Sequence, residues 1–159
     1  MSPADARMTF LAAECRRDWG TVKSYLARAR SVDPSQSAAH AALVALALDH
    51  AYQAFETILV KLERAVGLPE RTGASWHSAL LADAGMALAG LRPPLFPPET
   101  LGDWDALLRF RHFLRHAYAV ELEGAKLSSN VDRLERAVTL TDQWIDAVLD
   151  VLAPPSAPA

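Results

Sequence analysis

A cluster of prolines near the middle of the chain sets the strongest limit on its fold. Prolines occupy positions 93, 94, 97 and 98. Such a segment cannot continue a helix, because proline lacks the amide donor and holds the backbone in an extended geometry. We therefore expect residues 91–100 to form a stiff extended crossover between two helices of the same domain.

The rest of the sequence indicates helical segments separated by helix-breaking residues. Asp33-Pro34 disfavours helical geometry before the proline, Gly67 and Pro69 close a second segment, and Gly124 stops a later one. No stretch shows the two-residue alternation of a strand bounded by hairpin turns. We predict an all-α five-helix bundle, with helices at 3–30, from 34 or 35 to 66, 75–89, from 100 or 103 to 121, and 129–152.

The second predicted helix has an unusual middle section. Between Ala41 and Leu48 it is apolar nearly all round. A helix of this kind normally lies at the centre of a bundle, where other helices cover every face. We therefore expect it to be the central helix.

Composition narrows the class of protein. The chain has 159 residues and is 51% hydrophobic, which predicts one domain with a proper core over residues 1–152. The formal net charge of -3 argues against nucleic-acid binding by bulk electrostatics, so any such contact must be local. Residues 153–159, with three prolines, are expected to be a disordered tail.

Cellular location follows from what the sequence lacks. Cys15 is the sole cysteine, so no internal disulfide and no cysteine-based metal cluster can form. The N-terminal apolar run is short and flanked by acidic residues, unlike a signal peptide, and no 18 consecutive residues are apolar. We expect a soluble, cytoplasmic protein in which Cys15 serves packing.

The residues with the most chemical potential lie between Arg109 and Tyr118. This stretch holds three arginines, two histidines and a tyrosine without a carboxylate, whereas a solvated helix normally mixes the signs of its charges. Helical winding predicts a buried face made of Leu107, Phe110, Phe113, Leu114 and Ala117. It also predicts two polar stripes with an anion-binding groove between them. One stripe consists of Trp104, Arg111, Arg115 and Tyr118, and the other of Asp105, Arg109, His112 and His116.

Three functions fit this arrangement. One is a basic solvent face, or a docking surface for an acidic partner helix. Another is metal-independent RNA cleavage, in which His116 moves protons at the ribose and Arg111, helped by Arg115, stabilises charge on the phosphate. The third is a metal site of Asp105, His112 and His116, which the absence of a fourth ligand and the nearby Arg109 disfavour.

A single helix presents Arg111 and His116 poorly to one atom. Five residues apart, they lie roughly 140° apart around the helix axis. Two copies of the helix, facing each other across a two-fold axis, would line one cleft with residues from both chains. This geometry is a reason to expect a homodimer.

The stretch from Phe110 to Tyr118 contains a motif that resembles the motif of a known family. Phe110-Arg111-His112-x-x-Arg115-His116-x-Tyr118 is similar to the R-x4-6-H motif of HEPN domains, in the R-x4-H-x-Y form of HepT-like ribonuclease toxins. Further similarities lie in Tyr52-x-x-x-Glu56, in Trp76-His77-x-x-Leu80-Leu81, in the proline-rich crossover and around Leu122. The resemblance covers residues 35–150.

The resemblance implies a function and a set of site residues. It implies a homodimeric, metal- and cofactor-independent endoribonuclease with Arg111 and His116 as catalytic residues and His112 lining the site. It also implies a cognate nucleotidyltransferase antitoxin of the MNT type that adds AMP to Tyr118, where a bulky anion would occupy the place of the substrate phosphate. Arg109 also fits the looser R-x6-H spacing, and we assign it a helper role.

Three further residues bear on the site, and one alternative function stays open. Glu56 can reach the motif helix to orient Arg111 or a histidine, or can be a buried carboxylate that arginine satisfies. Trp104 can stack on a base or bury itself in a dimer contact. His77 is expected to be a packed histidine outside the site. The alternative function is a catalytically silent HEPN helical module that regulates or docks to a nucleotidyltransferase.

Overall fold

Five α-helices make up most of the protein. The computed structural model describes residues 2–117 and 120–153, and within them there is no β-strand, which confirms the all-α prediction. Tyr118 and residues 154–159, most of the expected tail, lie outside the described residues. The helices are α1 (Pro3–Arg30), α2 (Ala38–Ala65), α3 (Trp76–Ala84), α4 (Leu101–His116) and α5 (Gly124–Leu152), and a 3-10 turn, η1 (Pro98–Thr100), precedes α4.

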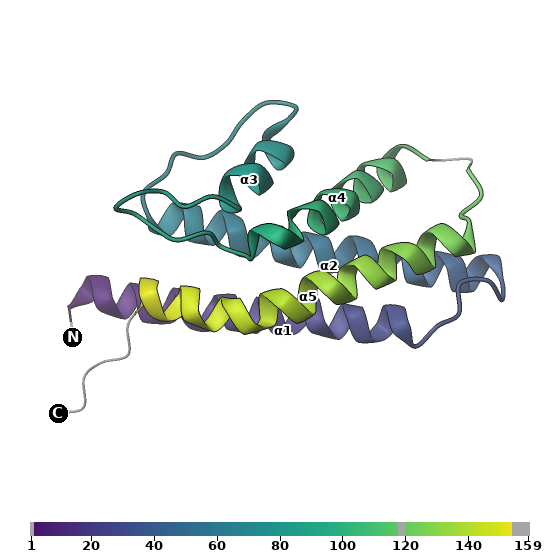
Figure 1. Cartoon of the computed structure of the whole chain (residues 1–159), viewed down its shortest axis with the longest axis horizontal. Coiled ribbons are helices and arrows are strands. Elements are labelled where there is room, and N and C mark those ends of the chain that lie inside the picture. The colour runs from purple at the N-terminus through teal and green to yellow at the C-terminus, as the bar shows by residue number, and fades with distance from the viewer. Residues whose placement is uncertain (1, 118–119, 154–159) are drawn as a thin grey trace.

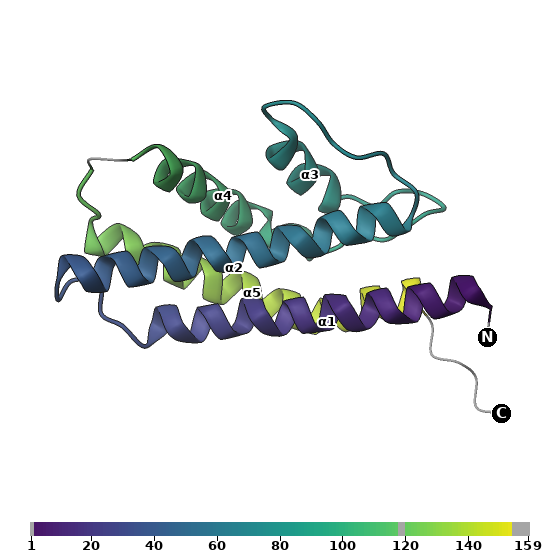
Figure 2. The same ribbon diagram turned by 180° about the vertical axis from the view of Figure 1, so that it is seen from behind.

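The second helix, α2, is the central one, as its apolar middle predicts. It contacts each of the other four helices, with α3 and α4 on one side and α1 on the opposite side (Figures 1 and 2). By length and composition α2 is apolar enough to cross a membrane, but 56% of its most apolar window is buried inside the bundle. That burial is typical of a core helix.

An aromatic cluster attaches the motif helix to α2. The ring of Phe55 on α2 stacks on Trp104 of α4 with ring centroids 3.7 Å apart. Phe55 also meets Trp19 of α1 edge-on at 6.5 Å and Phe96 of the crossover at 5.7 Å. Because aromatic rings bury large apolar areas, this cluster fixes the position of α4 on α2.

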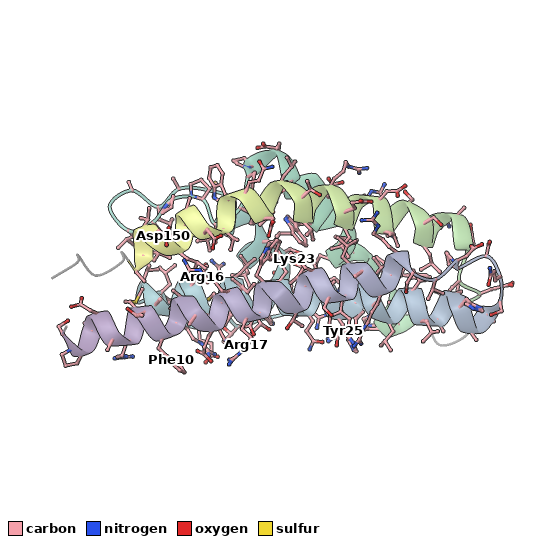
Figure 3. All side chains as sticks on the ribbon, turned by 90° about the horizontal axis from the view of Figure 1, so that it is seen from below. Phe10, Arg16, Arg17, Lys23, Tyr25 and Asp150 are labelled. Carbon is pink, nitrogen blue, oxygen red and sulfur yellow. The ribbon has the colours of Figure 1, made fainter. Side chains whose placement is uncertain are left out.

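Charged pairs tie α1 to α5 along the opposite side of the molecule. Arg16 pairs with Asp146 at 3.1 Å and with Asp150 at 2.9 Å. Figure 3 shows Arg16 on α1 and Asp150 on α5. Asp142 accepts hydrogen bonds from the indole of Trp19 at 2.8 Å and from Lys23 at 3.0 Å. Exposed pairs of this kind each contribute little to stability, so they align helices that the core already holds together.

Helices α2 and α3 are shorter than expected because side chains bind their ends. The hydroxyl of Ser37 accepts a hydrogen bond from the His40 amide, so α2 begins at Ala38 instead of residue 34 or 35. The predicted third helix runs to residue 89, but α3 ends at Ala84. There the buried guanidinium of Arg92 donates to the carbonyl oxygens of Asp83, Met86 and Pro93.

The end of α4 and the start of α5 also differ from expectation. Gly124 was predicted to stop the fourth helix, but α4 ends at His116, and Gly124 is the first residue of α5. A side chain at Gly124 would come within 3.3 Å of the backbone of Ser35 in the α1–α2 connection. Glycine therefore permits a close approach of two loops here.

Candidate functional site

The buried face of α4 differs from the one that helical winding predicted. Its buried residues are Trp104, Leu107, Leu108 and Arg111. Of the five residues expected inside, only Leu107 is fully buried, and Phe113 is 43% exposed. The prediction was wrong because it assigned every polar or amphipathic side chain to solvent. The stripe that includes Arg111 instead packs onto α2.

Trp104 is a core residue and presents no surface for a base or a partner. Its exposed fraction is 0%, and its ring lies flat against Phe55. The predicted stripe of Trp104, Arg111, Arg115 and Tyr118 is therefore not an exposed one: Trp104 and Arg111 are buried, Arg115 is exposed, and Tyr118 lies outside the described residues.

Arg111 is buried because two carboxylates of α2 compensate its charge. Its Nη1 donates to Glu56 Oε1 at 3.1 Å, and its Nε lies 3.1 Å from Asp49 Oδ1 as an ion pair without hydrogen-bond geometry. The side chain of Arg111 is 6% exposed and that of Glu56 is 7% exposed. Buried charges persist only when they are paired, and here Glu56 pairs with Arg111 as expected.

The second oxygen of Glu56 binds a residue that we had placed outside the site. Glu56 Oε2 lies 2.7 Å from Nδ1 of His77, at the start of α3. The His77 ring stacks on Trp76 with centroids 3.7 Å apart, and it meets the ring of His112 edge-on at 5.7 Å. The structure thus joins α2, α3 and α4 through Asp49, Arg111, Glu56, His77 and His112, which we call the carboxylate–histidine network.

His112 lies at the solvent side of this network. Loss of hydration lowers its pKa from the ordinary value of 6.5, and the neighbouring His77, Arg111 and Arg115 lower it further. Its imidazole is therefore neutral at pH 7. A neutral ring beside an arginine can accept or donate a single hydrogen bond without adding charge.

His116 ends α4 with one ring nitrogen occupied. Its Nδ1 lies 2.8 Å from the carbonyl oxygen of His112, one turn earlier. Because a carbonyl only accepts, Nδ1 carries the proton, and in the neutral ring the lone pair is on Nε2. The side chain is exposed, as is that of Arg115, which forms no ion pair with any described residue. This last turn of α4 therefore presents a proton acceptor and a cation to solvent.

Arg109 lies apart from the carboxylate–histidine network. It pairs with Asp105 at 3.0 Å and lines an open groove of about 520 Å³ between α4 and the start of α5. Phe110 and Phe113 form part of the same groove. Arg111 faces α2 instead, so the structure does not bring Arg109 and Arg111 to one point.

The residues proposed for a metal do not converge. Asp105 is engaged by Arg109, and His116 by a backbone carbonyl. Across 2–117 and 120–153, no three His, Cys, Asp or Glu side chains cluster as metal ligands.

Comparison with protein families matches most of the chain to a known group. The family model described as HepT-like protein matches residues 43–152. The chain belongs to the HepT-like family, as the motif resemblance predicted. The matched range of this HepT-like chain includes the carboxylate–histidine network and His116. Comparison with curated proteins and with solved structures gives no significant match.

Two residues of the network in this HepT-like protein were not predicted. Asp49 lies two helical turns before Glu56 on the same face of α2, and this spacing, directly after the apolar section of the helix, was the available signal. The sequence predicts a packed His77 outside the site, because a histidine after a tryptophan gives no indication of the carboxylate that it contacts in the folded chain.

Proposed function

We propose that this HepT-like protein is a metal- and cofactor-independent endoribonuclease, the toxin of a toxin–antitoxin module, acting in the cytoplasm as a single domain over residues 1–152. Arg111 and His116 are its catalytic residues. The observation that carries the proposal is the hydrogen bond that fixes the tautomer of His116. Its Nδ1 proton is fixed on a backbone carbonyl, which leaves Nε2 as an exposed base one residue after Arg115, which is exposed and forms no ion pair with the described residues.

The chemistry needs one base, one acid and positive charge. Nε2 of His116 takes the proton of a ribose 2′-hydroxyl, and the 2′-oxygen attacks the adjacent phosphorus. The bond from phosphorus to the 5′-oxygen breaks, and that oxygen takes a proton from the protonated His116 of the partner subunit. The products are a 2′,3′-cyclic phosphate and a 5′-hydroxyl, and no metal is required.

Arg115 and Arg111 have different roles in binding the phosphate. Arg115 is exposed and makes the first contact with the RNA backbone. Arg111 stabilises charge on the phosphorane through Nε, the donor that lacks a hydrogen-bond acceptor among the described residues. Since Asp49 already lies beside this atom, the phosphate must displace the Asp49 carboxylate to reach it. His112 and Glu56 support the site, and Arg109 contacts RNA further along α4.

A second copy completes the site. The exposed residues of α2 between Ala38 and Gln53 carry no charge, and Leu43 and Leu46 are 56% and 51% exposed. This uncharged face adjoins the part of α4 that pairs with Asp49, so self-association would bring two copies of the motif helix together. The double variant L43E/L46E is expected to be monomeric by light scattering and to lose cleavage.

The antitoxin is a nucleotidyltransferase that adds AMP to Tyr118. Tyr118 lies outside the described residues, two positions after His116. An adenylyl group there would place negative charge and bulk beside Arg115 and His116 and so exclude the substrate phosphate. Incubation with the nucleotidyltransferase and ATP should therefore add one AMP by mass spectrometry and abolish cleavage, and Y118F should stay active under the same treatment.

The decisive test is cleavage of RNA in EDTA. The parent protein is compared with H116A, R111Q and R115A, and with H40N as a matched histidine control at the start of α2. We expect the parent and H40N to produce 2′,3′-cyclic phosphate ends, and H116A and R111Q to produce none. Cleavage by H116A equal to that of the parent would refute the assignment of His116.

One observation favours a second candidate, the catalytically silent binding module. In the single chain Arg111 is neutralised by Asp49 and Glu56, which is an arrangement suited to structure alone. The silent module predicts no cleavage by a parent protein whose Tyr118 is unmodified by mass spectrometry. It also predicts a stable complex with a nucleotidyltransferase that survives both R111Q, on the buried face of α4, and H116A, at the exposed end of that helix.

A further inference from the structure

We infer that His77 is a positioning residue of this site, which holds the Glu56 carboxylate so that Glu56 in turn orients Arg111. The inference rests on the proposed ribonuclease function and adds a residue that the HepT-like motif does not contain. His77 comes from α3, whereas Arg111 and His116 lie on α4.

The two oxygens of Glu56 have separate partners. Oε1 accepts from Arg111 Nη1 at 3.1 Å, and Oε2 lies 2.7 Å from His77 Nδ1. Glu56 is only 6% exposed, so water cannot readily replace either partner. With both oxygens bound, the carboxylate plane has one orientation. Without His77, the carboxylate can rotate, and the hydrogen bond to Arg111 weakens.

His77 is itself held in place. Its ring stacks on Trp76 at 3.7 Å with 28° between the ring planes, and the short helix α3 is fixed at its far end by Arg92. A helix of nine residues is not stable alone, so these contacts determine where His77 lies. The imidazole therefore acts as a fixed donor toward Glu56.

The position of His77 also connects it with the reactive end of α4. Its ring faces the edge of His112 at 5.7 Å, and the carbonyl oxygen of His112 accepts the Nδ1 proton of His116. Because His116 is bound by the backbone carbonyl of His112 and His77 contacts only the ring of His112, a displaced His77 would disturb Arg111 through Glu56 and leave the tautomer of His116 unchanged. This difference predicts a loss in kcat through Arg111.

Three substitutions at His77 distinguish the contribution of its hydrogen bond to Glu56 from that of its ring stacking on Trp76. H77F keeps a flat ring for Trp76 but has no donor, H77N places an amide nitrogen near the former Nδ1, and H77A removes both. We expect H77F and H77A to lower kcat about 10- to 100-fold, the range for loss of a hydrogen bond to a charged group, with KM little changed. H77N should recover most of the rate. Equal rates for H77F and the parent, or a rate for H77N as low as that of H77A, would overturn the inference.

A second measurement is independent of cleavage. In 15N NMR spectra of the folded variants, the Arg111 Nε–H resonance should move in H77F and return toward its parent position in H77N. An Arg111 resonance that is the same in the parent, H77F and H77N would refute the positioning role. If the parent cleaves no RNA, the proposed function fails while this comparison still decides the role of His77.

Discussion

Replacing Glu56 with alanine should destabilise the protein far more than loss of an ordinary ion pair. The substitution removes the hydrogen-bonded partner of a buried arginine, because Glu56 and Arg111 are 7% and 6% exposed at the side chain. Breaking a buried pair from one side costs about 3–5 kcal/mol. Asp49 stays 3.1 Å from Arg111 Nε and offsets part of the lost charge, so we expect the lower end of that range.

The assay is urea unfolding followed by circular dichroism at pH 7. The matched control is E70A, because Glu70 pairs with Arg64 at 2.7 Å while its side chain is 75% exposed. Such a surface pair contributes at most about 1 kcal/mol. Equal losses in the free energy of unfolding for E56A and E70A would refute the buried network. A cycle of E56A, R111A and the double variant should show coupling above about 0.5 kcal/mol, and additive effects would contradict direct pairing.

Three further outcomes are expected. Burial raises the pKa of the Cys15 thiol to about 11; Ellman's reagent at pH 8 should therefore label Cys15 in urea but not in the native protein. W104A should lower the free energy of unfolding by about 3–5 kcal/mol in urea titrations, since the ring is fully buried on Phe55, whereas L140A at a 39% exposed position should cost far less. The pKa of His112 lies below 6.5, so the unfolded chain binds the proton first, and stability should fall as the pH drops through 6.5 toward the folded pKa; H112N should flatten that decrease in unfolding curves, and an NMR titration midpoint at or above 6.5 would contradict it.

Local sequence signals predicted the fold well at positions where a single residue type strongly limits the backbone or its burial. The apolar middle of α2 permits few alternatives, and the central position of this helix is confirmed. The prolines of the crossover interrupt the helices as predicted, but Pro98–Thr100 form the 3-10 turn η1, so the prediction of an extended chain as far as residue 100 was wrong there. The boundaries that failed depend on contacts between distant residues. Gly124 shows this clearly: as a helix breaker it suggests an end, but its role is to let the start of α5 approach Ser35.

The candidate site was predictable in its motif but not in its surroundings. Helix periodicity assigns an arginine to the solvent-exposed face of its helix. It cannot reveal that Asp49 and Glu56 on α2 compensate the charge of Arg111. The same information was missing for His77, whose partner is 21 residues away in sequence. Pairing of this kind is a property of the folded chain, because it requires three helices to be placed first.

The layered arrangement around α2 separates two kinds of evolutionary constraint. Helix α1 contacts α2 and α5 but, within the described residues, neither α3 nor α4, which carry His77, Arg111 and His116. The family match begins at residue 43 and leaves α1 outside it. Substitutions in α1 that keep its apolar stripe on α2 are therefore expected to leave the carboxylate–histidine network intact. Substitutions tolerated in α1 should be poor guides to those tolerated across the three helices of the site.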